Sequence, residues 1–202
     1  MSRAASGNVG PQRAFTNTFG VGAGLGAVAY VVNYVLVYLF LVVDEADLGD
    51  EGWKAAGQVL YNAMFVATEV TANGQTVTFN LVTGTSSSAL LEPFLGGSDV
   101  TSTVPSFVYH AAPIVVLLAV GAIAVKQTGS RLQTASAAVT GATVAVGYLV
   151  LSALGVFLFE TTSEGVLSSS TTAPETMPAI LLAGLALPVV LGTIGGLLAN
   201  EL

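Results

Sequence analysis

The sequence contains no cysteine and only one histidine, and these two absences exclude several kinds of site. Without cysteine the chain has no disulfide, no catalytic thiolate and no cysteine metal site. The single histidine, His110, cannot build a metal site from several imidazoles. The sequence therefore predicts no metal site, no bound cofactor and no catalytic residue.

Charged residues are also scarce. Only 8% of the 202 residues are Asp, Glu, Lys or Arg, whereas ordinary soluble proteins carry about 25%. A soluble domain of this size would lack the charge to cover its surface, and 53% of this chain is hydrophobic. Five Lys and Arg against twelve Asp and Glu give a net charge of −7, which argues against nucleic acid as a partner. The composition indicates that the lipid bilayer is the main partner.

The stretch FGVGAGLGAVAY, at 19–30, has a glycine at every second position from Gly20 to Gly26. Such spacing occurs in dinucleotide-binding turns, but those turns follow a hydrophobic strand. The preceding residues, GNVGPQRAFTNTF, form no such strand. We interpret the stretch as the start of a membrane helix, in which the Gly20/Gly24 and Gly22/Gly26 pairs let a neighbouring backbone come close.

Four long runs without Asp, Glu, Lys or Arg follow one another along the chain. At about 1.5 Å per residue, each run is long enough to cross a hydrocarbon core of about 30 Å. The first run is longer than the apolar region of a signal peptide and ends in LFLVVDEAD, so we expect it to stay in the protein. The predicted transmembrane helices are 21–43, 107–125, 135–159 and 177–199.

The five cations predict the orientation of these helices. Arg3 and Arg13 precede the first run, Lys126 and Arg131 lie between the second and third, and only Lys54 lies elsewhere. Because Lys and Arg are enriched in the cytoplasmic segments of membrane proteins, this pattern predicts a multi-pass protein of the cell membrane with both termini cytoplasmic. The predicted cytoplasmic segments are the tail 1–20, the link 126–134 and the C-terminus 200–202. The predicted extracellular loops are 44–106 and 160–176.

The long segment 44–106 contains a predicted amphipathic helix at about 50–67. Its polar face carries Gln58 and Asn62, and its apolar face carries Trp53 and Met64. The helix would either lie on the outer membrane surface or cap the extracellular mouth of the bundle. The sequence does not choose between these two placements.

A β-hairpin is predicted at about 68–82, because residues of alternating polarity flank the pair Asn73-Gly74. The Ser and Thr runs at 83–88 and 168–172 are interpreted as flexible outside loops. Together these elements predict an all-α membrane protein, a four-helix transmembrane bundle with a long extracellular loop that contains the amphipathic helix and the hairpin.

Polar side chains inside the predicted spans are few, and Asn33 is the most polar near mid-span. Tyr30, Tyr34 and Tyr38 repeat every four residues, so they either line a pocket near Asn33 or simply pack against neighbours. His110, at the outer edge of the second span, is either a pH-sensing or ligand group or an interfacial polar residue. None of these residues by itself predicts a reaction.

Catalysis is the least supported class of function. Ser152 lies in mid-span, while the only histidine lies at the far end of another helix, so a serine–histidine pair is not expected. Small residues line two of the spans and are interpreted as packing within the bundle or against another copy, with a gating kink at Pro188 as the alternative. These small-residue lines are Ala137, Gly141 and Ala145 in the third span and Gly184, Pro188, Gly192 and Gly196 in the fourth.

The runs GAVAYVVNYVLVYL and WKAAGQVLYNAMFV, joined by an acidic loop, resemble an uncharacterised family of haloarchaeal four-helix integral membrane proteins. The resemblance implies a halophilic archaeal membrane protein and brings no functional residue with it. We expect an accessory, scaffold or envelope component that is not an enzyme. The alternative is an oligomeric permease or channel subunit for a small solute or ion. Either protein would associate with its own copies or with a membrane protein partner.

Overall fold

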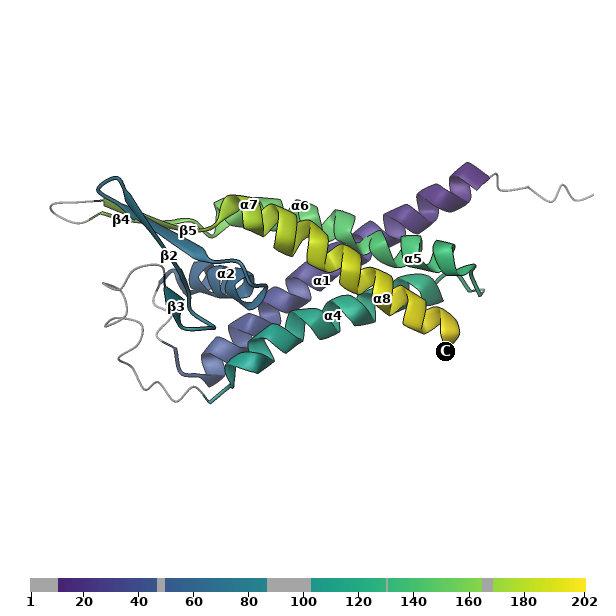
Figure 1. Ribbon diagram of the computed structural model, residues 1–202, viewed down its shortest axis with the longest axis horizontal. Helices are drawn as coiled ribbons and strands as arrows, with labels where there is room; N and C mark the ends of the chain where they lie inside the picture. Colours follow the sequence, from purple (N-terminus) through teal and green to yellow (C-terminus); the bar gives the residue numbers. More distant parts are fainter. Residues whose placement is uncertain (1–10, 47–49, 87–102, 130, 165–168) are drawn as a thin grey trace, which may run out of the picture.

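Four long apolar helices run side by side and build most of the molecule (Figure 1). The computed structural model describes residues 11–46, 50–86, 103–129, 131–164 and 169–202. Among these residues, four helices are long and apolar enough to cross a membrane, which confirms the predicted four-helix membrane bundle. They are Phe19–Val43, Ser106–Lys126, Thr134–Leu158 and Thr176–Glu201.

The first span belongs to a longer helix, α1 (Pro11–Val43). It begins ten residues before the predicted span, so the second half of the predicted tail 1–20 is helical. Proline is well suited to the first helical position, because its missing N–H has no helical partner there. Residues 1–10 lie outside the described part of the chain.

The other three spans differ in regularity. α4 (Ser106–Lys126) is continuous, whereas the third span divides at Thr143 into α5 (Thr134–Ala142) and α6 (Val144–Leu158). The fourth span consists of α7 (Thr176–Pro178), the π-helix η1 (Ala179–Ala186) and α8 (Leu187–Glu201).

The irregularity expected at Pro188 takes the form of the π-helix that ends just before it. The N–H of Leu187 bonds to the carbonyl of Leu182, five residues back rather than four. Pro188 follows as an early residue of α8, where its missing N–H is tolerated. The widened turn therefore absorbs the disturbance that a proline inside an α-helix would cause.

Glycines let the helix backbones touch. A Cβ on Gly147 of α6 would overlap the backbone of Ala23 in α1, and a Cβ on Gly192 of α8 would overlap the backbone of Gly141 in α5. Gly22 faces Thr143, between α5 and α6, and Gly26 faces α6, whereas Gly20 and Gly24 have open space around them. Of the two predicted glycine pairs, one packs the bundle and the other faces outward.

A short helix and a small sheet cover one end of the bundle, which we call the sheet end. Helix α2 is Gly52–Ala63. The strands are β1 (Thr68–Ala72), β2 (Gln75–Asn80), β3 (Thr85–Ser86), β4 (Thr161–Glu164) and β5 (Ser169–Pro174). Their order is β3-β2-β1-β5-β4, and every neighbouring pair is antiparallel.

The predicted hairpin is present as β1 and β2. Asn73 and Gly74 connect the strands with φ of 52° and 75°, the left-handed pair that a two-residue type I′ turn requires. The sheet is larger than predicted, because β4 and β5 come from the segment predicted as the loop 160–176. The prediction of flexible loops is wrong for residues 169–172, which belong to β5 and pair with β1, and for residues 85–86, which form β3 and pair with β2. Residues 87, 88 and 168 of the two predicted loops lie outside the described part of the chain.

Two sets of polar contacts fix the ends of the spans. At the sheet end, Asp44 accepts hydrogen bonds from the Val104 N–H and the Tyr109 hydroxyl, both at 2.6 Å, which joins the end of α1 to the start of α4. At the opposite end, the guanidinium of Arg131 donates to the carbonyls of Asn200 and Glu201, both at 3.1 Å. Positive charge at the C-terminus of α8 is favourable for the helix dipole.

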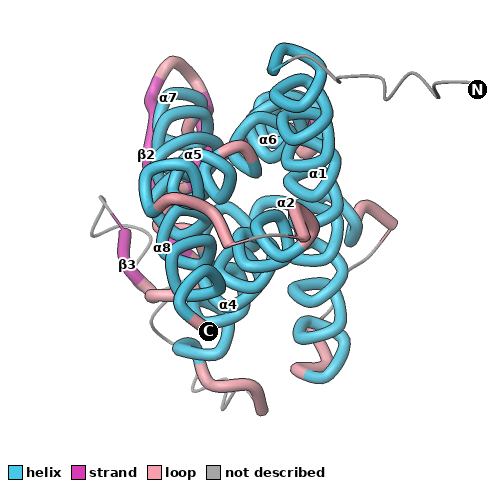
Figure 2. The backbone as a smooth tube through the Cα atoms, turned by 90° about the vertical axis from the view of Figure 1, so that its right-hand side faces the viewer, coloured by secondary structure: helices cyan, strands magenta, loops and turns pink. Residues whose placement is uncertain are grey.

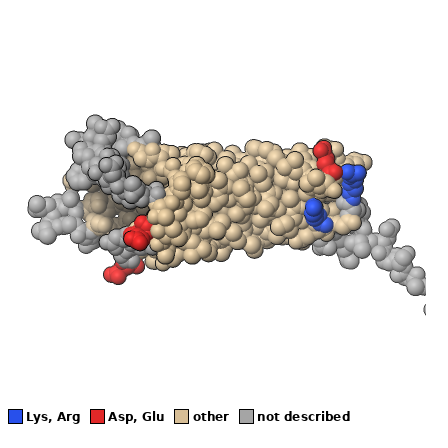
Figure 3. Space-filling model, turned by 90° about the horizontal axis from the view of Figure 1, so that it is seen from below, with Lys and Arg blue, Asp and Glu red and all other residues tan. Residues whose placement is uncertain are grey.

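In the part of the chain that the structure describes, charged residues lie at the two ends of the molecule. Acidic side chains lie at the sheet end, and the opposite end, which we call the basic end, carries the blue side chains in Figure 3. In the described residues these are Lys126 and Arg131, with Glu201 close by. The uncharged surface between the ends is what a hydrocarbon slab requires.

Candidate functional site

Helix α2 does not lie flat on a membrane surface, because most of it is buried in the mouth of the bundle. All its residues from Ala56 to Ala63 are buried, and Figure 2, viewed along the long axis, shows the helix beside α1 and α4. Of the two predicted placements, the capping one is correct. Trp53, assigned to the apolar face, is 41% exposed and packs edge-on against Phe159.

Gln58 and Asn62, assigned to the polar face of α2, are also buried. Gln58 Nε2 donates to the Phe159 carbonyl at 2.9 Å. Asn62 Nδ2 donates to Thr68 Oγ1 at 2.9 Å, and its Oδ1 accepts from the Leu81 N–H at 2.8 Å. These amides bind the surrounding backbone in place of water, so α2 connects the bundle to the sheet.

A group of buried polar side chains meets beneath α2, and we call it the tyrosine cluster. Each member is at most 6% exposed. Its members are Tyr30 and Asn33 of α1, Tyr61 of α2, Met64 directly after α2, and Tyr148 and Ser152 of α6.

One half of the tyrosine cluster binds α2 to α1 and α6. The Tyr61 hydroxyl donates to the Ser152 carbonyl and lies 3.1 Å from the Tyr30 hydroxyl. The Ser152 hydroxyl donates to the Ala179 carbonyl, the first residue of the π-helix, at 3.0 Å. Burial raises the pKa of Tyr61 above its usual value, so the side chain is a neutral phenol near neutral pH.

The other half contains a mismatch of donors and acceptors. Asn33 Nδ2 donates to the Tyr148 hydroxyl at 3.2 Å, and that hydroxyl donates to the sulfur of Met64 at 3.0 Å. Asn33 is fully buried, and its Oδ1 has no hydrogen-bond partner among the described residues. Buried polar atoms are nearly always paired, so this oxygen is an exception.

The predicted tyrosine stripe divides between two environments. Tyr30 lies in the cluster with its ring edge against Tyr148, while Tyr34 stacks on Phe159 and donates to the Trp53 carbonyl at 2.9 Å. Tyr38 is 37% exposed. A four-residue step advances about 40° beyond a full helical turn, so the three side chains rotate away from one face.

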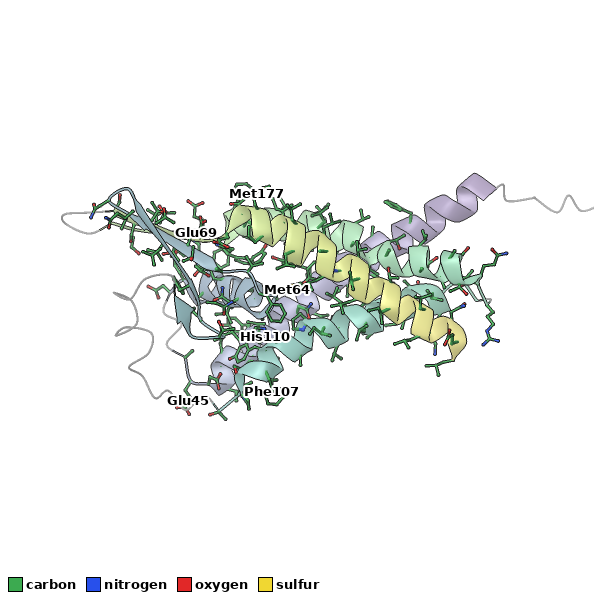
Figure 4. All side chains as sticks on the ribbon, in the orientation of Figure 1. Glu45, Met64, Glu69, Phe107, His110 and Met177 are labelled. Carbon is green, nitrogen blue, oxygen red and sulfur yellow. The ribbon has the colours of Figure 1, made fainter. Side chains whose placement is uncertain are left out.

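His110 holds the end of α2. Its Nδ1 lies 2.7 Å from the Ala63 carbonyl, and its ring stacks on Phe65 with the ring centres 4.6 Å apart. Figure 4 shows Met64 and His110 within the mouth of the bundle, whereas Met177 lies on the outside. His110 and Ser152 bind different backbone carbonyls, so the two side chains do not pair.

The small-residue lines of the third and fourth spans pack inside the bundle, as the first interpretation expected. Ala137 and Ala145 are buried, and Gly141 meets Gly192. Gly184 faces Ser152. The cluster residues that the sequence did not identify as functional candidates are Tyr61, Met64 and Tyr148. The two tyrosines look like ordinary aromatic residues in their runs, and Met64 was expected only on the apolar face of the helix.

Four apolar spans, charges confined to the ends and a polar cluster sealed in the interior define a multi-pass membrane protein. The chain belongs to a family of unknown function (DUF7978), whose model matches residues 1–202. Membership confirms the resemblance to an uncharacterised family, and the haloarchaeal origin stays a prediction. No curated protein and no solved structure shows significant similarity to the chain.

Proposed function

We propose that this protein is a non-enzymatic accessory, scaffold or envelope component, with the sheet end outside the cell and both termini in the cytoplasm. The observation that carries the proposal is α2, which fills the mouth of the bundle and is hydrogen-bonded to α1, α4 and α6. A filled mouth suits a rigid support for the sheet. The absence of charged side chains inside the described spans agrees with this role, since ion-coupled transporters use such groups as relays.

Purification from native membranes in a mild detergent tests the scaffold role. A stable complex with another membrane protein, of fixed stoichiometry and without solute flux after reconstitution, is the expected result. A monomer that purifies alone and stays alone after chemical cross-linking in intact cells would contradict it.

The orientation is tested with an epitope tag inserted between Asn73 and Gly74, at the tip of the β1–β2 hairpin. We expect protease added to intact spheroplasts to remove this tag, while a tag after Leu202 stays protected until the cells are lysed. The reverse pattern would overturn the proposed orientation and leave the fold untouched.

An oligomeric permease or channel subunit for a small solute or ion is the second candidate. The unpaired oxygen of Asn33, buried in a span, favours it, because polar groups within membrane helices often mark a transport path. Flux through proteoliposomes above that of empty vesicles, abolished by Asn33→Leu or Tyr34→Ala, would support it. Flux that survives both substitutions would contradict a path through this region.

A halophilic origin is part of the proposal and rests on the acidic residues of the sheet end. At about 1 M salt the Debye length falls to about 3 Å, so these acids would hydrate the surface rather than attract partners. We expect the purified protein to unfold at a higher temperature in molar KCl than in dilute buffer. A lower unfolding temperature in molar KCl would argue against this origin.

A further inference from the structure

The hydrogen bonds around Asn33 leave one strong acceptor unused and one strong donor poorly used. Asn33 Oδ1 has no partner among the described residues, and the Tyr148 hydroxyl gives its proton to the Met64 thioether. A thioether sulfur is a weak acceptor, whereas an amide oxygen is a good one. Both groups belong to side chains that already touch, with Nδ2 and the hydroxyl 3.2 Å apart.

Turning the Asn33 amide over does not remove the mismatch. The turned amide would accept the Tyr148 proton on its oxygen, but its NH₂ group would then lose the acceptor that it has now. In either orientation, part of a fully buried amide lacks a partner among the described residues. The described residues therefore leave, at Asn33, hydrogen-bonding capacity that another molecule can use.

We propose that Asn33, Tyr148 and Met64 form a binding site for one small, uncharged molecule that carries a hydroxyl group. The oxygen of that hydroxyl accepts the proton of Tyr148, and its hydrogen is donated to Asn33 Oδ1. The guest takes the place of the Met64 sulfur at Tyr148. A neutral guest matches the neutral side chains of the site, because the described spans contain no charged side chain to offset the lost hydration of an ion.

Met64 is the member of the site best able to move. Its side chain is unbranched and has several rotatable bonds, so it can leave Tyr148 without disturbing the backbone. Tyr148 is held by the edge of the Tyr30 ring, with the ring centres 5.2 Å apart. The proposed binding site does not depend on whether the protein is a transporter.

The proposal can be tested by following the NMR signals of the methionine methyl groups, because the chain has three methionines and one of them is Met64. The full-length protein is labelled with ¹³C at the methionine methyl groups, placed in lipid nanodiscs and titrated with glycerol. The Met64 methyl signal is expected to shift and to saturate as glycerol rises. Met177, which is 65% exposed, is the internal control and is expected to show no saturating shift.

Two variants and a second compound make the test specific. Asn33→Leu and Tyr148→Phe each remove one hydrogen bond to the guest and are expected to weaken the Met64 response roughly tenfold or more. Tyr38→Phe removes a hydroxyl elsewhere and is expected to leave the response unchanged. Titration with 1,2-dimethoxyethane, which has oxygen acceptors but no hydroxyl, is expected to produce no saturating shift.

The proposal is overturned if Met64 and Met177 respond alike to glycerol, or if the Met64 response persists in both variants. It is also overturned if 1,2-dimethoxyethane matches glycerol. Should Asn33→Leu fail to fold, Tyr148→Phe alone decides the outcome, because it keeps the ring that packs against Tyr30.

Discussion

Replacing Tyr61 by phenylalanine is expected to loosen α2 from the bundle while keeping every apolar contact of the ring. The substitution removes the hydroxyl that donates to the Ser152 carbonyl and contacts the Tyr30 hydroxyl at 3.1 Å. Tyr30 is only 6% exposed, so water cannot readily replace the lost partner. The free energy of unfolding is therefore expected to fall by the cost of one unpaired buried hydroxyl.

That cost is about 1–3 kcal/mol. For a chain of this size, each kcal/mol lowers the unfolding temperature by about 2–4 °C, so the variant is expected to melt roughly 2–12 °C below the wild type. The double variant Tyr30→Phe/Tyr61→Phe removes both hydroxyls, so neither hydroxyl of the pair is left without its partner. It is expected to be no less stable than Tyr61→Phe alone, which is a strong departure from additivity.

Thermal unfolding in one detergent, followed by circular dichroism, measures these differences. Tyr38→Phe is the control, since the Tyr38 ring is 37% exposed, and it is expected to melt within about 1 °C of the wild type, as surface substitutions do. Hydrogen exchange should show faster exchange in α2 of the Tyr61→Phe variant than in α8. If Tyr61→Phe behaves like Tyr38→Phe, or if the double variant costs the sum of the singles, the assigned contact does not hold α2.

Three further changes test the packing and the two ends of the bundle. Gly147→Val is expected to abolish the folded peak in size-exclusion chromatography, because the new side chain enters the α1 backbone; Gly24→Val, where space is open, should leave the peak intact. Asp44→Ala removes two short hydrogen bonds and should speed limited proteolysis near residues 103–105 severalfold, and an equal effect from Glu45→Gln would refute that role. Arg131→Ala should speed amide exchange in the last turn of α8 about fivefold; unchanged exchange would show that its carbonyl contacts contribute nothing.

The spans and the first hairpin could be predicted because their signals are local. The second span was expected at 107–125 and is Ser106–Lys126, since a run without charge ends where water begins. The hairpin followed from Asn73 and Gly74, whose left-handed backbone fixes the turn whatever surrounds it. Both predictions depend on residues that are close together in the sequence.

The strands β4 and β5 could not be predicted, and the choice between the two placements of α2 could not be made, because both depend on distant partners. β5 is mostly Ser and Thr, which are also typical of loops, and it becomes a strand because β1 supplies the backbone partners. Gln58 and Asn62 repeat at helical spacing like a solvent-facing stripe, but they form hydrogen bonds with backbone groups that are distant in the sequence. The periodicity of the sequence shows which positions of a helix are polar. It does not show whether a polar side chain forms its hydrogen bonds with water or with a carbonyl of the protein.

The sequence also did not predict which side chains meet in the tyrosine cluster. Asn33 is recognisable from the sequence as a polar residue in an apolar run, and Tyr30 as one of a regular stripe. Tyr61 and Tyr148 had no such signal, because a tyrosine among apolar residues is common at membrane interfaces and in cores. Only the crossing of α1, α2 and α6 brings the four side chains together.

The place of β1 in the middle of the sheet has a consequence for how the protein is made. One neighbour, β2, follows within a few residues, but the other, β5, emerges from the ribosome only after two more spans. At a synthesis rate of about 5–20 residues per second, the intervening stretch of roughly a hundred residues takes about 5–20 seconds. Throughout that interval one edge of β1 has no partner strand, so the nascent chain passes through a stage at which a chaperone or a foreign strand could bind there.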